Sequence, residues 1–91
     1  MLNAEQMRAA RGWLGLSQDD LARRSGVAKR TIARFEQNLS VPYDRTLRDL
    51  QSCLEEMGIE FVFEGAVGVG IRGSRAAAGK AASARTKKRA R

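Results

Sequence analysis

Two capping boxes near the start of this 91-residue chain constrain its fold more than any other feature. Asn3 is followed by Gln6, and Ser17 by Asp20, at the spacing that lets two side chains satisfy the free N–H groups of a helix start. Each box is framed by an apolar pair with the spacing of a hydrophobic staple: Leu2 with Met7, and Leu16 with Leu21. Glycines at positions 15 and 26 suit left-handed helix ends. The sequence therefore predicts two short helices in succession.

Two further helices are expected before the pattern changes. A third helix is predicted over residues 29–37, with Ile32 and Phe35 facing inward and polar residues facing outward. Pro42 restrains the entry to a fourth helix, about Asp44–Met57, and Gly58 is its expected C-terminal cap. The fourth helix carries a clean apolar stripe with steps of three and four residues: Leu47, Leu50, Leu54 and Met57. Cys53 flanks this stripe and is expected to fill the core.

After Gly58 the hydrophobic period changes from helical to alternating. One strand is predicted from apolar residues that alternate with polar or smaller ones: Ile59, Phe61 and Phe63. Gly65 and Ala66 could form a turn, and a second alternation follows at Val67, Val69 and Ile71. Gly68 and Gly70 weaken this second stretch. A lone hairpin is marginal in water, so we expect the segment to pack on the helices or to pair with another chain.

The net charge of +7 is concentrated at the C-terminal end. Residues 1–73 hold ten basic and ten acidic residues, whereas Ser74–Arg91 holds seven basic residues and no acid. This end has no large apolar residue, so the sequence predicts a disordered basic tail. It is either a solubilising appendage or an arm attracted to a polyanion. Residues 23–34 contain five bases and no acid, whereas residues 44–64 contain six acids and two bases, so a polyanion would meet the 23–34 side.

Composition also excludes several classes of protein. The chain has no His and one Cys, which leaves no intramolecular disulfide, no structural zinc site and no Ser/His/Asp or Cys/His catalytic set. No apolar run reaches the length of a membrane span, and the polar N-terminus is unlike a signal peptide. We therefore expect a cytoplasmic protein that is not an enzyme and that needs neither cofactor nor metal.

The segment Ser17–Glu36, SQDDLARRSGVAKRTIARFE, resembles the helix-turn-helix of the Cro/phage-repressor-type (XRE-like) regulators. The residues at the family's spacings are Gln18, Ala22, Gly26, Ile32 and Phe35. The resemblance covers about Leu2–Met57 and implies a mainly α fold. This fold is a compact four-helix, lambda-repressor-like domain (residues 1–58), followed by a short β-strand or hairpin (59–72) and the disordered basic tail (73–91). The strand segment replaces the family's fifth helix.

The resemblance also implies roles for single residues. Gln18 would hold a DNA phosphate, and the exposed start of the third helix would read base edges through Lys29, Arg30 and Arg34. Arginine and lysine suit guanine O6 and N7 in the major groove. Second-rank candidates for methyl or phosphate contacts are Thr31, Ala33 and Gln37. Arg11 and Glu36 match an ion pair that ties the first helix to the third. Arg23 and Arg24 either contact phosphate or form a solvated face, and Ala28 replaces a common Ser or Thr at the helix start.

The function expected from these features is that of a sequence-specific regulator of transcription, a repressor that binds double-stranded DNA. It would read the major groove with helix 29–37 as a homodimer on a palindromic operator. Dimerisation would use the strand segment through Ile59, Phe61, Phe63, Val67, Val69 and Ile71. Three alternatives stay open: an antitoxin-type autoregulator, a protein-interaction module that binds a partner protein, and a nonspecific nucleoid-associated binder.

Overall fold

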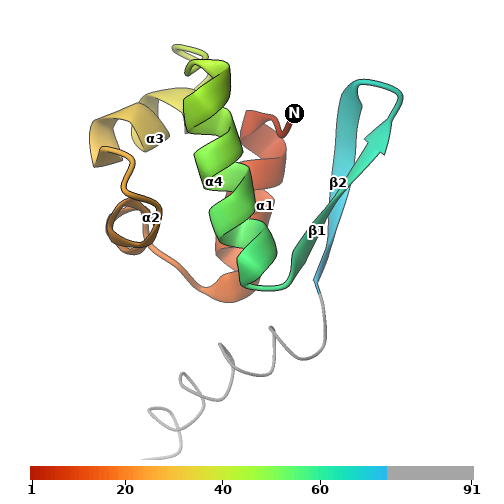
Figure 1. Cartoon of the computed structure of the whole chain (residues 1–91), viewed down its shortest axis with the longest axis horizontal. Coiled ribbons are helices and arrows are strands. Elements are labelled where there is room, and N and C mark those ends of the chain that lie inside the picture. Colours follow the sequence, from red (N-terminus) through yellow and green to blue (C-terminus); the bar gives the residue numbers. More distant parts are fainter. Residues whose placement is uncertain (74–91) are drawn as a thin grey trace, which may run out of the picture.

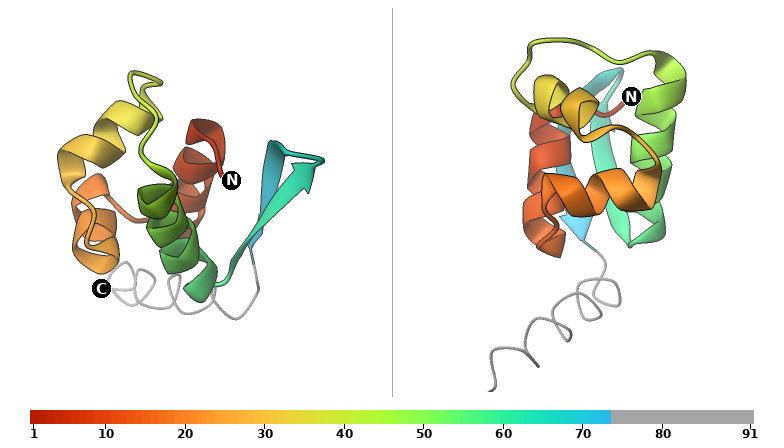
Figure 2. Two further views of the ribbon diagram at one scale, coloured as in Figure 1. Left: turned by 45° about the horizontal axis from the view of Figure 1, so that its top comes forward. Right: turned by 90° about the vertical axis from the view of Figure 1, so that its left-hand side faces the viewer.

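The computed structural model describes residues 1–73, which form four helices followed by an antiparallel β-hairpin (Figure 1). The elements are α1 (Ala4–Leu14), α2 (Gln18–Ser25), α3 (Lys29–Glu36), α4 (Asp44–Glu56), β1 (Ile59–Glu64) and β2 (Val67–Gly73). Helices α1 and α4 lie between the α2–α3 pair on one side and the hairpin on the other (Figure 2). This confirms the predicted mainly helical class. The predicted basic tail, Ser74–Arg91, lies outside the described residues.

Both capping boxes are present, so the first two helices begin as predicted. The Asn3 side chain accepts from the Gln6 backbone N–H at 2.9 Å, and Ser17 Oγ accepts from the Asp20 backbone N–H at 2.9 Å. In return, the Gln6 and Asp20 side chains accept from the backbone N–H groups of the two N-cap residues. Left-handed glycines end both helices, with φ of 70° at position 15 and 75° at position 26. The capping side chains and the left-handed glycines therefore determine where each of these two helices begins and ends.

Helices α3 and α4 each end one residue earlier than predicted. Gln37 and Met57 are the C-caps rather than the last helical residues. Gly58, predicted to be the cap of α4, follows the cap and has a φ of 96°. Asn38 takes the same left-handed region after α3, with a φ of 59°. In both places a left-handed residue turns the chain out of its helix directly after the cap.

One hydrophobic core joins all six elements. The largest fully buried side chains come from every helix: Met7, Leu21, Ile32, Leu50 and Leu54. The predicted stripe of α4 is confirmed at Leu47, Leu50 and Leu54, whereas Met57 is half-buried at the end of the helix. Cys53 packs against the core and is half-buried, and burial raises the pKa of its thiol. The hairpin contributes Ile59 and Phe61, so it completes the core of the helical domain.

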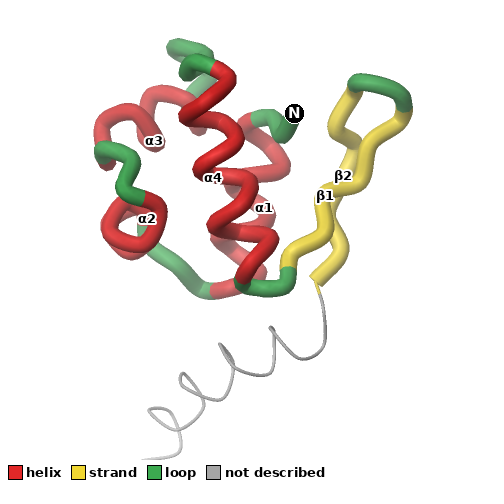
Figure 3. Tube along the Cα trace, viewed as in Figure 1, coloured by secondary structure: helices red, strands yellow, loops and turns green. Residues whose placement is uncertain are grey.

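Strands β1 and β2 lie side by side (Figure 3), and their register contains a bulge in β2. Phe61 lies opposite Ile71 and Val62 opposite Gly70, but Phe63 lies opposite Gly68. Between these last two pairs, β1 advances by one residue and β2 by two. Val69 is therefore an extra residue in β2, which forms a β-bulge. Although its glycines predict a weak strand, β2 therefore pairs with β1 along the whole length of β1.

Two glycines of β2 allow the hairpin to lie close against α1. A Cβ atom at Gly68 would lie 2.1 Å from Gln6 Oε1, and one at Gly73 would lie 2.1 Å from Trp13 Nε1. Neither glycine has a positive φ, so the requirement is one of space rather than of backbone conformation. A glycine inside a strand often marks such a close approach.

The first capping box also fastens the hairpin to the helices. Gln6 is only 2% exposed, and its Nε2 donates to the carbonyl oxygens of Val62 and Gly70, each at 3.0 Å. Asn3 Nδ2 donates to the Gly68 carbonyl oxygen at 3.0 Å. The Gln6 amide thus bonds both strands beside the bulge.

Candidate nucleic-acid interface

Helices α2 and α3 cross on the side of the molecule opposite the hairpin (Figure 2). The turn between them contains Gly26, which is left-handed, and Val27, which is buried. Ile32 and Phe35 hold α3 to the core, with 0% and 5% of their surface exposed. Ala22, the small residue expected at the contact of the two helices, packs against this core. The predicted inward face of α3 is therefore confirmed, and its opposite face is turned outward.

The outward face of α3 carries most of the predicted DNA-binding residues. Four of them are exposed: Lys29, Arg30, Arg34 and Gln37. Thr31 and Ala33 are half-buried on the flanks of this face. Within residues 1–73, Arg30 and Arg34 have no acidic partner within 4.0 Å, whereas Lys29 Nζ lies 3.3 Å from Asp19 Oδ1. The helix thus presents three cations, two of which are free of intramolecular ion pairs in this part of the chain.

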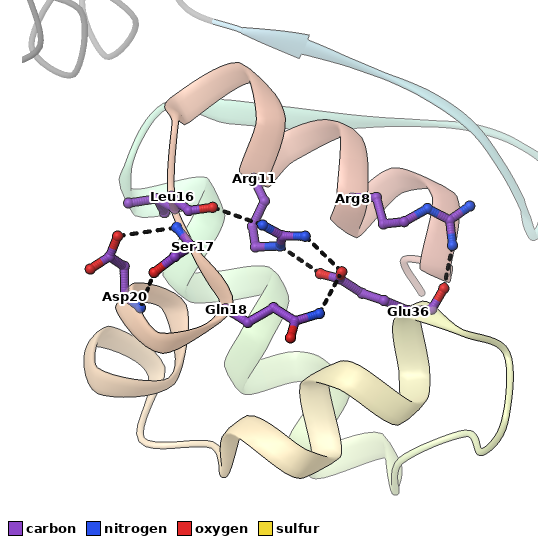
Figure 4. A network of polar contacts seen from close by, with 7 residues as sticks. All are labelled: Arg8, Arg11, Leu16, Ser17, Gln18, Asp20 and Glu36. Atoms are coloured by element: carbon purple, nitrogen blue, oxygen red, sulfur yellow. Dashed lines mark hydrogen bonds and ion pairs between the residues drawn. The ribbon is translucent and has the colours of Figure 1, made fainter.

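A partly buried polar network fixes α3 relative to α1 and α2 (Figure 4). The Glu36 carboxylate is at its centre and is only 4% exposed. Arg11 donates to it through two nitrogens, Nε at 2.7 Å and Nη2 at 2.8 Å. Gln18 Nε2 donates to Glu36 Oε1 at 3.0 Å. The ion pair expected between the first and third helices is present, and Gln18 joins it from α2.

The ionisation of Glu36 follows from these contacts. Burial on its own would raise the pKa of this carboxyl, but the hydrogen bonds from Arg11 and Gln18 and the charges of Arg11 and Arg8 bring the pKa below its ordinary value of 4.5. The same hydrogen bond raises the pKa of the Arg11 guanidinium above its ordinary value. Glu36 is therefore a carboxylate at neutral pH, and both members of the Arg11–Glu36 pair are charged.

Two arginine contacts of α1 extend the network beyond the expected pair. Arg11 Nη1 donates to the Leu16 carbonyl oxygen at 2.9 Å, which ties the α1–α2 connection to the same guanidinium. Arg8 donates to the backbone carbonyl of Glu36 at the end of α3. Sequence reasoning missed Arg8, although its place three residues before Arg11 puts both side chains on one face of α1.

Gln18 has one of its two amide N–H donors committed to Glu36. A phosphate contact by this side chain would therefore use the second N–H of the same group. The α3 N-cap, Ala28, makes no side-chain hydrogen bond, as its residue type implies. Of the two arginines near the end of α2, Arg23 Nη2 pairs with Asp20 at 2.7 Å and is 73% exposed, while Arg24 Nη1 contacts the Met57 sulfur at 3.7 Å.

The predicted dimerisation residues fall into two groups. Ile59 and Phe61 are buried in the chain's own core, and Phe63 and Ile71 pack against it. Val67 and Val69 are 63% and 50% exposed. Only these two valines have side chains largely free for contact with another molecule. Sequence alternation marked all six as apolar but could not separate the inward residues from the outward ones around the bulge.

Metal-ligand clusters and membrane-spanning helices are both absent from residues 1–73. Residues 1–73 contain no group of three or more acidic or cysteine side chains placed to hold a metal ion. Among the four helices described, none is long and apolar enough to cross a membrane.

The comparison with known families agrees with this geometry. The helix-turn-helix family model matches residues 7–60, which run from the first turn of α1 into β1 and include the whole α2–α3 pair. None of the curated proteins matches the chain. The match covers more than half of the sequence and all the elements that position the outward face of α3. The chain therefore belongs to the Cro/phage-repressor-type, XRE-like helix-turn-helix family of DNA-binding regulators.

Proposed function

We propose that this protein is a sequence-specific regulator that inserts α3 into the major groove of double-stranded DNA. The observation that carries this proposal is the outward face of α3, where Arg30 and Arg34 are exposed and free of ion pairs within residues 1–73. An arginine fork can donate two hydrogen bonds to guanine O6 and N7. The Glu36 network supports the same proposal, because a helix that reads bases has to be held in one orientation.

The test begins with selection of duplexes from a randomised pool by the full-length protein. We expect an enriched sequence, and Arg30→Ala or Arg34→Ala should weaken binding to it by about 1–3 kcal/mol while relaxing base preference. Arg72→Ala is the matched control, because Arg72 is exposed and pairs with Glu60 on the hairpin, far from α3 (Figure 1). If both α3 variants bind the selected and mismatched duplexes like the wild type, α3 does not read the groove.

We further infer that the regulator is a repressor that acts in the cytoplasm as a two-fold dimer on a palindromic operator. One helix contacts only a few base pairs, so such domains bind two half-sites about one helical turn apart. The hairpin supports a dimer because it is a two-stranded sheet with no further strand among residues 1–73. Exposed strand edges readily pair with another chain. Val67 and Val69 would lie at this contact.

Removal of the whole hairpin would not test the dimer, because Ile59 and Phe61 belong to the core. The exposed valines allow a milder change. Val67→Lys with Val69→Lys should give a folded monomer in sedimentation and weaker binding to a two-half-site duplex. Val41→Lys is the control, because Val41 is 79% exposed in the loop after α3. A double variant that still sediments as a dimer would place the interface elsewhere.

A further inference from the structure

Lys29 is held by an acid within the same face that we propose for DNA binding. Its Nζ lies 3.3 Å from Oδ1 of Asp19, in the first turn of α2. The two side chains are 56% and 58% exposed, so the pair is open to solvent and to any ligand that reaches this face. Asp19 directly follows Gln18, the residue expected to contact phosphate. A carboxylate thus lies beside the DNA-facing end of α2.

We propose that Asp19 is a specificity-determining residue: its carboxylate restrains Lys29 so that this cation discriminates a base edge from a phosphate. The inference rests on the proposed function, because it assigns a role within the same interface. Arg30 and Arg34 have no such restraint in the described part of the chain. Lys29 is therefore the α3 cation for which Asp19 favours a base over a phosphate as the DNA contact.

The discrimination follows from the charge of the two possible DNA partners. The Lys29 ammonium has three N–H donors, so it can keep Asp19 and donate to a neutral acceptor such as guanine O6 or N7 at the same time. A phosphate carries the same sign of charge as Asp19, so the ammonium can bring both anions close only against their mutual repulsion. A phosphate contact thus displaces the Asp19 pair, whereas a base contact leaves it in place.

Asp19 also shortens the reach of Lys29. A lysine side chain is long and flexible, and a free ammonium would find the nearest phosphate on any duplex. With Asp19 as a partner, the side chain is drawn toward the start of α2. The carboxylate therefore lowers affinity for random DNA more than it lowers affinity for a site with a guanine at the matching position.

The experiment measures binding of the full-length protein to the selected duplex and to a random duplex over a range of salt concentrations. The variants are Asp19→Asn, Lys29→Gln and the two combined. Asp19→Asn keeps the size of the side chain and removes its charge. The control is Glu64→Gln, which removes one negative charge from the exposed end of β1, on the opposite side from α2 and α3 (Figure 1). Thermal melts establish that each variant is folded.

Asp19→Asn should raise affinity for random DNA about two- to fivefold, the range expected for loss of an exposed ion pair, and should change affinity for the selected duplex less than twofold. Its salt slope on random DNA should steepen by about 0.9, the value for one added phosphate contact. In the Lys29→Gln background, Asp19→Asn should no longer alter the preference between the two duplexes. Glu64→Gln should alter neither quantity.

Two results would overturn the inference while leaving the proposed function intact. One is an Asp19→Asn effect of equal size with and without Lys29, which would mean that the carboxylate only repels phosphate. The other is an equal gain on both duplexes, which would mean that Asp19 does not discriminate. By contrast, a wild-type protein with no preferred duplex would refute the proposed function, and the inference with it.

Discussion

Gly68→Ala should destabilise the fold because the added methyl group would collide with the amide that joins the hairpin to α1. The new Cβ would lie 2.1 Å from Gln6 Oε1, 2.4 Å from Cδ and 2.8 Å from Nε2. These distances are far below van der Waals contact, so one of the two groups must move. The three atoms are the far end of a flexible side chain, so Gln6 is the group that moves.

The size of the effect follows from the hydrogen bonds that Gln6 would lose by moving. It donates to the Val62 and Gly70 carbonyl oxygens and accepts from the Asn3 N–H, each at 3.0 Å. Each such bond contributes about 0.5–1.5 kcal/mol net. Replacement of glycine by alanine recovers about 0.4–1 kcal/mol through the unfolded chain. We therefore expect a loss of about 2 kcal/mol, which corresponds to a fall in Tm of about 8–16 °C for a domain of this size.

The assay is urea unfolding of the full-length protein, followed by the fluorescence of Trp13, which lies against Gly73 at the end of β2. Gly70→Ala is the matched control, because a Cβ there meets nothing within 4 Å and the strand is the same. Gly70→Ala should be neutral or slightly stabilising. In a Gln6→Ala background the obstacle is gone, so Gly68→Ala should lose its effect. Equal stability of the two glycine variants would mean that a side chain at position 68 does not displace the Gln6 amide.

Two further predictions concern the charged groups. Glu36→Gln should destabilise the fold by about 1.5–3 kcal/mol at neutral pH, because the partly exposed Arg11 guanidinium loses its charged hydrogen-bond partner. The folded-state pKa of Glu36 lies below 4.5, so the stability it supplies is complete above that pH and is lost as pH falls through the folded value; urea titrations should show this acid loss in the wild type and not in the variant. Deletion of Ser74–Arg91, which carries seven cations and no acid, should weaken selected and random DNA binding alike and flatten the salt slope by about 0.9 for each phosphate contact removed. An unchanged slope would mean that this end does not engage DNA.

The helical part of the fold could be predicted because its signals are local. The two capping boxes, the left-handed glycines and the α4 stripe each specify a helix boundary or face within a few residues of sequence. The errors at Gln37 and Met57 are one residue each, and they occur where the C-cap keeps a negative φ (−90° and −88°) and the left-handed residue comes one position later. The outward cations of α3 were found for the same reason, since Ile32 and Phe35 fix its inward face.

The contacts that sequence reasoning missed are those between distant segments. Gln6 reads as a capping-box residue, yet the same amide bonds Val62 and Gly70, more than fifty positions away. The glycines of β2 read as weak points of a strand because the close approach of α1 leaves no mark near them in the sequence. Likewise, the Asp19–Lys29 pair joins two helices whose crossing geometry is a property of the folded domain.

The reading of bases by α3 can be measured by replacing one guanine of the selected duplex at a time with 7-deazaguanine. This change removes the N7 acceptor from the major groove and leaves base pairing intact. We predict at least one guanine whose replacement weakens wild-type binding about tenfold but does not further weaken binding by Arg30→Ala or Arg34→Ala. If the wild type tolerates replacement of every guanine, α3 does not read guanine in the major groove.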